Sequence, residues 1–187
     1  MLDPLHLAAD SPFCYYGRHY DCCFHVEMLI RPIQEPDWAP ILRLQDEAYH
    51  ALDPESEVVL RSKVQLGPET CLVACQAERV IGYCLAHPWL ANEPASLYQI
   101  YRQPKAEEGL YLHDMVVSPQ AQGQGVAVRF LQHLARHART HNFNRMSLVA
   151  VQGADRYWLR HQFCPQPCTK DLSAYGPGAV YMCCTVN

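Results

Sequence analysis

The stretch VSPQAQGQGVA, residues 117–127, places Gly123, Gly125 and Ala127 at alternate positions directly after an apolar run. Residues with little or no side chain let a ligand approach the backbone closely. The first N–H groups of a helix have no partner inside the helix, and the positive end of the helix dipole lies there. The stretch therefore predicts a phosphate-binding turn between a strand and a helix.

His113 is the second residue that could do chemistry. It lies in the apolar run LYLHDMVV, residues 110–117, just before the glycines. An imidazole titrates near neutral pH, so it can accept a proton from a reacting group. Strand alternation predicts that His113 shares a face with Met115 and Val117, and that Asp114 points to the other face. We expect a general base, and the alternative is a histidine hydrogen-bonded within a packed strand.

Two common phosphate-binding motifs do not fit the glycine-rich turn. A P-loop needs a lysine after its last glycine, and Val126 follows Gly125. A dinucleotide-binding turn needs a third glycine where Val128 stands, and it would follow an early strand rather than one that begins at residue 110. The turn therefore belongs to another class of phosphate site.

Hydrophobic periodicity predicts the elements that position these residues. Strands are expected at 28–33, 110–117, 145–151 and 178–186, with a hairpin over 71–89 that turns at 76–79. Helices are expected at 41–52, 55–63, 126–139 and 154–161, the third with an apolar stripe of Ala127, Leu131, Leu134 and Ala138. A long irregular segment separates the hairpin from the strand that carries His113. This order indicates an α/β fold with a mixed sheet and helices on both faces.

Length and composition limit the number of domains and the classes of partner. A chain of 187 residues that is 49% hydrophobic and 18% charged suits one domain, and the aperiodic residues 1–27 suggest an extension outside a core of residues 28–187. The net charge of −4 argues against nucleic acid and acidic membrane surfaces as partners. No apolar run approaches the roughly 18 residues of a membrane-spanning helix.

The ten cysteines of the chain predict free thiols. They form no CxxC pairs and follow no secretory segment, which favours a reduced, cytoplasmic protein. One group of residues could hold a metal but lacks the spacing of structural zinc sites: Cys14, His19, Cys22, Cys23 and His25. We therefore expect no metal site.

The segment from Gln122 to Ala127 resembles motif A of the GNAT superfamily of N-acetyltransferases, (Q/R)xxGx(G/A), at every specified position. ADRYWLRHQF, residues 154–163, is similar to motif B, AxxFYxxxGF, with Tyr157 and Trp158 in place of the Phe-Tyr pair. The strand YLHDMVV resembles that of the arylalkylamine N-acetyltransferase branch, HxHxLAV, where Tyr111 replaces the first histidine. With its opening and closing strands, the resemblance covers residues 28–187.

The resemblance implies a single-domain GNAT fold, with a mostly antiparallel sheet and a cofactor cleft where the central strands splay. It implies acetyl-CoA as cosubstrate and no metal. The backbone of β-strand residues would pair with the pantetheine arm, the N–H groups of the turn would hold the pyrophosphate, and an indole would pack beside the acetyl end. The implied cofactor-binding residues are Met115, Val116, Val117, Gln122, Gly123, Gln124, Gly125, Val126, Ala127 and Trp158. Arg129 and His133 either meet the outlying phosphate or form a solvated face.

The activity implied is acetyl transfer to a primary amine of a small molecule, which attacks the thioester directly in a ternary complex. His113 would accept the amine proton, by way of water. Trp158 cannot protonate the leaving thiolate, because an indole is not an acid in this range. Either another tyrosine does so, with Tyr111 and Tyr175 as candidates, or the thiolate leaves unassisted or by way of water. Expected acceptor-pocket residues are Asp46, Glu47, Trp89, Tyr98 and Tyr101. A homodimer is left open, and the alternatives are a protein or peptide N-acetyltransferase and a non-catalytic acyl-CoA-binding module.

Overall fold

The computed structural model describes residues 27–50, 52–103 and 107–186. The strands are β1 (Met28–Pro32), β2 (Leu72–Gln76), β3 (Arg79–Trp89), β4 (Gly109–Val117), β5 (Arg145–Ala150), β6 (Cys164–Pro165) and β7 (Val180–Thr185). The helices are α1 (Trp38–Ala48), α2 (Glu57–Leu66), α3 (Val126–Thr140) and α4 (Asp155–Leu159), with short 3-10 turns at Glu35–Asp37, Pro119–Ala121 and Ser173–Tyr175. The expected extension, apart from Glu27, lies outside the described residues, and so does the group from Cys14 to His25.

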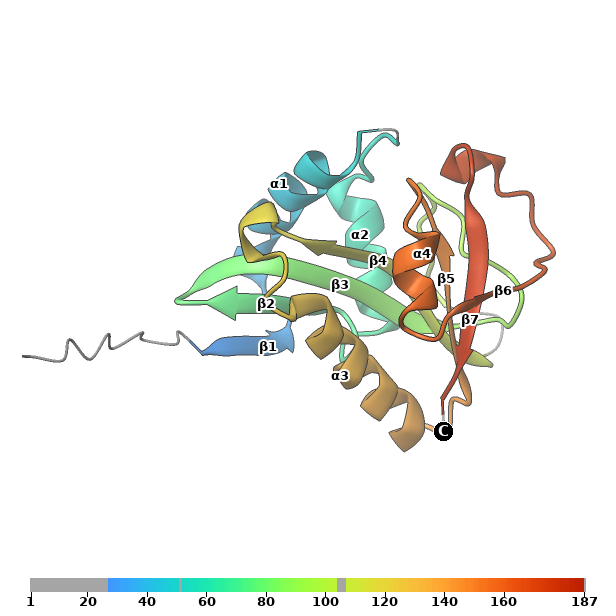
Figure 1. Cartoon of the computed structure of the whole chain (residues 1–187). Helices are drawn as coiled ribbons and strands as arrows, with labels where there is room; N and C mark the ends of the chain where they lie inside the picture. The colour runs from blue at the N-terminus through green and yellow to red at the C-terminus, as the bar shows by residue number, and fades with distance from the viewer. Residues whose placement is uncertain (1–26, 51, 104–106, 187) are drawn as a thin grey trace, which may run out of the picture.

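The seven strands form one sheet in the order β1-β2-β3-β4-β5-β7-β6. Every neighbouring pair is antiparallel except β4 and β5, which run parallel. Helices α1 and α2 cover one face of the sheet and α3 covers the other (Figure 1). The predicted mixed, mostly antiparallel α/β fold is confirmed, and the two-residue strand β6 is the one strand that the periodicity did not predict.

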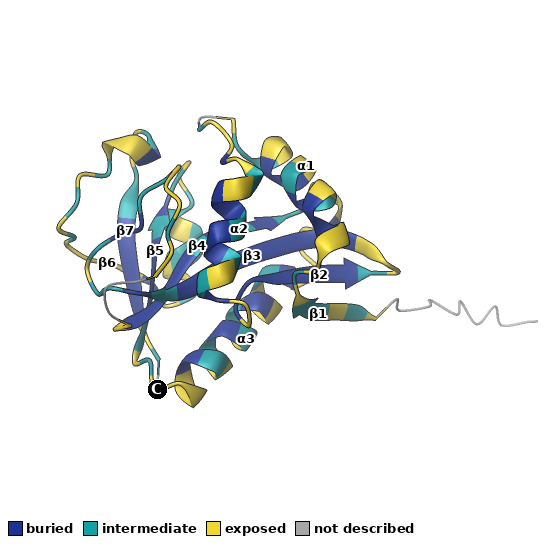
Figure 2. Ribbon diagram, turned by 180° about the vertical axis from the view of Figure 1, so that it is seen from behind, coloured by how far each residue is buried: buried dark blue, intermediate teal, exposed yellow. Residues whose placement is uncertain are grey.

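The core has one layer on each face of the sheet. Phe130 and Leu134 of α3 pack against Leu112 on one face, while Ile41 and Leu60 of α1 and α2 lie in the core layer of the other face. Figure 2 shows the central strands buried and the outer sides of the helices exposed. Burying these side chains contributes about 1.5–3 kcal/mol each relative to leaving them in water. The sheet is therefore a rigid platform for the residues at its centre.

Helix α3 buries a different stripe from the one predicted. The buried residues are Val126, Phe130, Leu134 and Ala138. In the first half of the helix the buried stripe therefore lies one residue before the predicted one, and in the second half the two agree. Ala127 faces a cavity instead, and Leu131 is only partly buried. The reason is that Phe130 is the largest apolar side chain on the helix and takes the central position in the core, with no exposed surface.

Helix α1 begins and ends earlier than the expected 41–52. It follows a 3-10 turn at Glu35–Asp37 and ends at Ala48, where Tyr49 takes up an extended conformation. The extended backbone at Tyr49 lets its hydroxyl group donate to the buried carboxyl group of Asp114 on β4. The early end frees Tyr49 and the residues after it to turn back toward the sheet.

The described cysteines are all free thiols, as expected. None of the helices within the described ranges is both long and apolar enough to span a membrane.

Candidate active site

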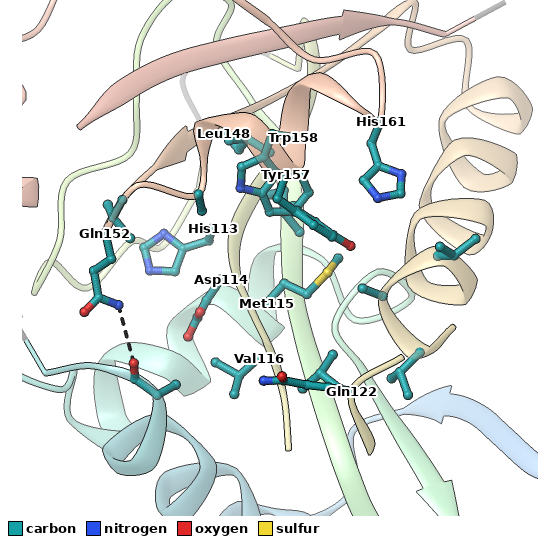
Figure 3. A pocket seen from close by; sticks show the side chains of 18 of the residues that line it. His113, Asp114, Met115, Val116, Gln122, Leu148, Gln152, Tyr157, Trp158 and His161 are labelled. Carbon is teal, nitrogen blue, oxygen red and sulfur yellow. Dashed lines mark hydrogen bonds between the residues drawn. The ribbon is translucent and has the colours of Figure 1, made fainter. Parts of the chain in front are cut away.

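Strands β4 and β5 separate in the middle of the sheet. Residues Leu110 to Leu112 of β4 pair with Met146 to Leu148 of β5, and beyond these residues the two strands diverge. A cavity of about 730 Å³ opens beyond this point. Its walls come from the second half of β4, the turn before α3, the end of β5 and α4 (Figure 3). This is the splayed cleft that the resemblance implies.

The glycine-rich turn forms one wall of this cavity. Gly123 and Gly125 have φ angles of +77° and +79°, which L side chains adopt rarely, and no atom lies within 4 Å of where a Cβ would stand at either residue. Helix α3 begins directly afterwards at Val126, and no side chain among the described residues caps it. Its first N–H groups are thus available at the positive end of a helix dipole, a geometry that suits a diphosphate.

Most of the residues expected to hold the cofactor line this cavity: Met115, Val116, Val117, Gln122, Gly123, Gly125, Val126, Ala127 and Trp158. Gln124 does not line it, because its side-chain amide turns back and donates to the carbonyl of Gln120 at 3.0 Å. Arg129 is also absent from the cavity wall, and His133 lines a separate groove on α3. Neither of these two basic residues therefore lines the large cavity, and Arg129 donates to the carbonyl oxygen of Met28 at 3.4 Å.

A β-bulge in β4 corrects the predicted alternation of side chains. Leu85 of β3 pairs with Asp114 and the next residue, Ala86, pairs with Leu112, so His113 is the extra residue. An extra residue lets two successive side chains point to the same face. Asp114 accordingly bonds to Tyr83 on the face covered by α1 and α2, the face on which His113 also lies. The expectation that His113 and Asp114 lie on opposite faces is wrong.

His113 forms a buried pair with Glu55. Its Nε2 lies 2.6 Å from Oε2 of Glu55, and the two side chains are 1% and 7% exposed. Burial opposes ionisation of Glu55, but the hydrogen bond and charge of His113 and the backbone N–H of Tyr98 outweigh it, so the pKa of Glu55 falls below its ordinary value. Gln45 holds the backbone of Glu55 through two hydrogen bonds, of 2.9 and 3.1 Å.

Asp114 takes part in a second buried network. The hydroxyl groups of Tyr49 and Tyr83 both donate to its carboxyl group, the latter at 2.6 Å. Burial nevertheless raises the pKa of Asp114, because the desolvation of its charged form outweighs these hydrogen bonds. With both carboxylate oxygens bonded, Asp114 fixes the positions of its neighbours.

A second, smaller cavity of about 50 Å³ adjoins the first. Tyr49, His113, Asp114, Val149 and Val151 line both of them. The smaller cavity also contains Asp53, Glu55, Leu97, Tyr98 and Tyr175, so its wall is acidic and aromatic. The two cavities meet at His113.

Of the residues expected in an acceptor pocket, only Tyr98 lines the second cavity. Trp89 is 5% exposed and packs edge-to-face on Tyr101, and Asp46 and Glu47 lie on the exposed side of α1. Sequence reasoning missed Asp53 and Glu55, which precede and follow Pro54. An acidic residue on each side of a proline before a helix is a weak signal, and only the fold brings it to His113.

The tyrosines occupy other positions than expected. Tyr111 is buried among Trp89 and Tyr181 and lines neither cavity, and its hydroxyl lies 3.4 Å from that of Tyr175. Tyr157 lines the large cavity beside Trp158, and Figure 3 shows its ring extending into the cavity. Trp158 packs edge-to-face on Phe163, with ring centroids 5.4 Å apart. The segment similar to motif B therefore places a phenol in the large cavity at Tyr157, one residue before Trp158, where the motif has its tyrosine.

Comparison with known proteins agrees with this geometry. Residues 38–163 match the family model described as "Acetyltransferase (GNAT) family". No curated protein matches the chain in a sequence search.

Solved structures share the fold at low sequence identity. The NatC complex bound to Gag peptide and CoA contains a chain that is 15% identical, with a TM-score of 0.66 over 86% of this chain and 99% of that one. The ribosomal-protein-S18-alanine N-acetyltransferase from Escherichia coli is 14% identical, with a TM-score of 0.63 over 86% and 95% of the two chains. A GNAT family acetyltransferase from Brucella melitensis in complex with acetyl-CoA is 21% identical, with a TM-score of 0.57 over 87% and 90%. Because the family model spans more than half of its length, the chain belongs to the GNAT family of acetyltransferases.

Proposed function

We propose that the protein transfers the acetyl group of acetyl-CoA to a primary amine of a small molecule, which attacks the thioester directly in a ternary complex. The observation that carries this proposal is the meeting of two cavities at His113. One has an open, uncapped helix start in its wall, and the other has an acidic wall. The first suits a diphosphate and the second suits an ammonium group.

The residues of the large cavity fit acetyl-CoA. The N–H groups of Gly123 and of Gly125 to Ala127 would bind the pyrophosphate, because the positive φ angles and the free space at the glycines leave the backbone accessible, while the N–H of Gln124 donates to the carbonyl of Ala121. On the side of β5, β4 has no strand partner beyond Leu112 among the described residues, so backbone groups of Met115 and Val117 can pair with the amides of pantetheine. When bound, acetyl-CoA supplies an activated carbonyl and a thiolate leaving group.

The small cavity would receive the amine as a cation. Glu55 is ionised at neutral pH because its pKa is lowered, and Asp53 lies in the same wall. A volume of about 50 Å³ holds the ammonium end of a molecule but little more of it. The acceptor would therefore enter this cavity with its ammonium group first, and the proposal includes the small arylalkylamines that act in the branch with the similar strand.

The pair of His113 and Glu55 would remove the amine proton. Nε2 of His113 donates to the carboxylate, so Nδ1 is the acceptor in the neutral ring, and Nδ1 has no partner among the described residues. The side chain is 1% exposed, so a water molecule would carry the proton to it. Glu55 then stabilises the imidazolium that results.

Tyr157 would assist the leaving group. As the new C–N bond forms and the C–S bond breaks, sulfur gains an electron pair that needs a proton. Tyr157 carries a hydroxyl group into the large cavity and Trp158 has none to offer. Burial raises the pKa of Tyr157, so its phenol is protonated and can donate at neutral pH.

Acetylation of a protein or peptide amine is the second candidate function. Its support is the likeness in fold to the NatC complex bound to Gag peptide and CoA and to the ribosomal-protein-S18-alanine N-acetyltransferase. A peptide N-terminus is also an ammonium group, so the acidic cavity alone does not separate the two acceptor classes. The resemblance of the strand YLHDMVV to that of the arylalkylamine branch favours the small molecule.

The test is to mix the full chain with acetyl-CoA and a panel of aliphatic amines, arylalkylamines and short peptides with free N-termini. Free thiol and acetylated product are then measured together. Equal amounts of thiol and acetylated small amine are expected. Turnover with peptides alone would select the second candidate, and thermal stabilisation by acetyl-CoA without turnover on any amine would contradict both.

A further inference from the structure

A group of metal-ligand residues lies at the C-terminal end of α3, in the groove that also contains His133 and away from the large cavity. His137 and His141 are four residues apart, so they share one face of the helix. Their rings stack with centroids 3.9 Å apart and an interplanar angle of 20°. Glu69, from the turn between α2 and β2, completes the group, with its Oε2 3.6 Å from Nδ1 of His137 and 4.0 Å from Nε2 of His141.

A backbone hydrogen bond fixes the ring of His141 for metal binding. Its Nδ1 lies 3.0 Å from the carbonyl oxygen of His137. A carbonyl oxygen only accepts, so Nδ1 carries the hydrogen and Nε2 presents its lone pair on the side of Glu69. A hydrogen bond from the second ring nitrogen to a carbonyl is the usual way in which proteins orient a metal-binding histidine.

We propose that Glu69, His137 and His141 bind one divalent transition-metal ion of the zinc class. Two imidazoles and a carboxylate are ligands that zinc accepts, and water would complete the coordination. The three ligand atoms all lie within 4.8 Å of one another. Zinc needs its nitrogen and oxygen ligands at about 2.0–2.2 Å. A ring nitrogen binds in the plane of its ring, so the rings of His137 and His141 must rotate out of their stack as Glu69 closes on the ion. The side chain of Glu69 is 72% exposed and can make that movement.

The ion would act on stability and not on acetyl transfer. None of its three ligands lines either cavity at the acetyl-transfer site. It would join the last turn of α3 to the turn before β2, two segments that are far apart in the chain. Because binding to the folded state alone raises stability, a metal at about 100 times its Kd would raise the melting temperature by roughly 5–10 °C.

The experiment uses Co²⁺ as an optical probe of the full-length, metal-free protein. Thiolates on cobalt give an intense charge-transfer band in the near ultraviolet, whereas imidazole and carboxylate ligands give only weak visible bands. This difference separates the proposed site from the cysteines elsewhere in the chain. The wild-type protein is expected to bind one equivalent with visible bands alone and to melt at a higher temperature with Zn²⁺.

Three variants complete the test. H137Q/H141Q and E69Q are expected to lose the visible bands and the thermal shift. H133Q, which changes a histidine of the same helix and groove outside the group, is expected to keep both. If the H137Q/H141Q protein binds Co²⁺ like the wild type, if only thiolate bands appear, or if H133Q abolishes binding as well, the proposed site is wrong.

Discussion

Nε2 of His113 lies 2.6 Å from the carboxylate of Glu55, and this contact joins the centre of the sheet to the segment just before α2. The bulge in β4 turns His113 toward this face, and Gln45 of α1 holds Glu55 from the other side. Three elements that are far apart in the sequence thus place one imidazole between two cavities. The carboxylate accepts the hydrogen of Nε2, so it fixes the orientation of the imidazole and leaves Nδ1 as the acceptor in the neutral ring.

The substitution His113→Ala is expected to lower kcat/KM by about 100-fold or more at neutral pH, since general-base catalysis contributes on this scale. The loss should shrink as the pH approaches 10, where about half of an alkylamine of pKa near ~10 is already free base in solution. Initial rates from pH 6.5 to 10 measure this. His50→Ala, an exposed histidine that lines neither cavity, is the matched control. A loss that is the same at every pH would make His113 a structural residue.

The substitution Glu55→Gln keeps the size of the side chain and removes its charge. It is expected to lower kcat/KM for the amine by roughly 10- to 100-fold, the range of a lost hydrogen bond to a charged group. The KM for acetyl-CoA should not change, because Glu55 lines only the small cavity.

Glu57→Gln is the control for that variant, since Glu57 is an exposed carboxylate two residues away that pairs with Arg61. If the two variants have the same kinetics, or if E55Q changes mainly the KM for acetyl-CoA, Glu55 does not act on the amine. A circular dichroism spectrum and a melting curve show whether E55Q is folded.

Much of the fold could be predicted from the sequence, because hydrophobic periodicity is local. The hairpin, β4 and α3 follow from it, and the glycine-rich turn follows from the two glycines and the start of a helix. The stripe on α3 was misplaced because periodicity does not say which of two adjacent apolar residues is central, and packing placed Phe130 there. Hydrophobic periodicity thus predicts that a helix forms more reliably than it predicts which of its residues are buried.

The acidic half of the site could not be predicted, for two physical reasons. A bulge is one extra residue in a hydrogen-bonded ladder, and nothing in the run LYLHDMVV marks its place at His113. Glu55 lies 58 residues from His113, so their contact depends on the whole packing of α1 and α2 against the sheet. Strand alternation alone therefore predicts that Asp114 lies on the opposite face from His113, whereas the two residues lie on the same face.

The substitution Gly125→Val is expected to weaken binding of CoA by roughly 10- to 100-fold, because a side chain would occupy the space over the backbone N–H groups that bind the pyrophosphate. Gly178→Val is the matched control. Gly178 has a similar φ of +73° and open space around it, but it lines neither cavity of the site. Both variants should lose about 1–2 kcal/mol of stability from the left-handed backbone. Calorimetry with CoA should separate them, and equal affinities would contradict the proposed role of the turn.

The substitution Tyr157→Phe is expected to lower kcat by about 100-fold and to leave the KM for acetyl-CoA within a factor of two, because the phenol donates only as sulfur leaves. Tyr111→Phe is the comparison, since Tyr111 is buried away from both cavities. It should lose some stability with its hydroxyl contact to Tyr175 and keep its turnover. If Y111F loses turnover and Y157F does not, the proton donor is the tyrosine of β4.

Lys63 makes the stability of the protein depend on pH above neutrality. Its side chain has no exposed surface, and its Nζ donates to the carbonyl of Gln99 at 2.7 Å. Burial lowers the pKa of Lys63 to about 8, and the charge of Glu55 offsets only part of that. The ordinary pKa of a lysine is about 10.4, so between these two values the unfolded chain binds a proton that the folded chain does not.

Lys63 should therefore contribute a free energy of unfolding that rises as the pH increases from 8 toward 10.4, against the opposite contribution of the buried cysteines, whose pKa values are raised. Urea denaturation of the wild type and of Lys63→Met at pH 7, 8, 9 and 10 isolates this contribution, and the free energy of unfolding of the wild type is expected to rise relative to that of K63M over this range. Arg61→Met is the matched control on the same helix, because the guanidinium of Arg61 stays charged over this range: its ion pairs with Glu35 and Glu57 raise its pKa further. If K63M and R61M keep equal slopes, Lys63 remains protonated in the folded protein, and its buried charge is stabilised by Gln99 and by the ring of Tyr101, 4.3 Å away.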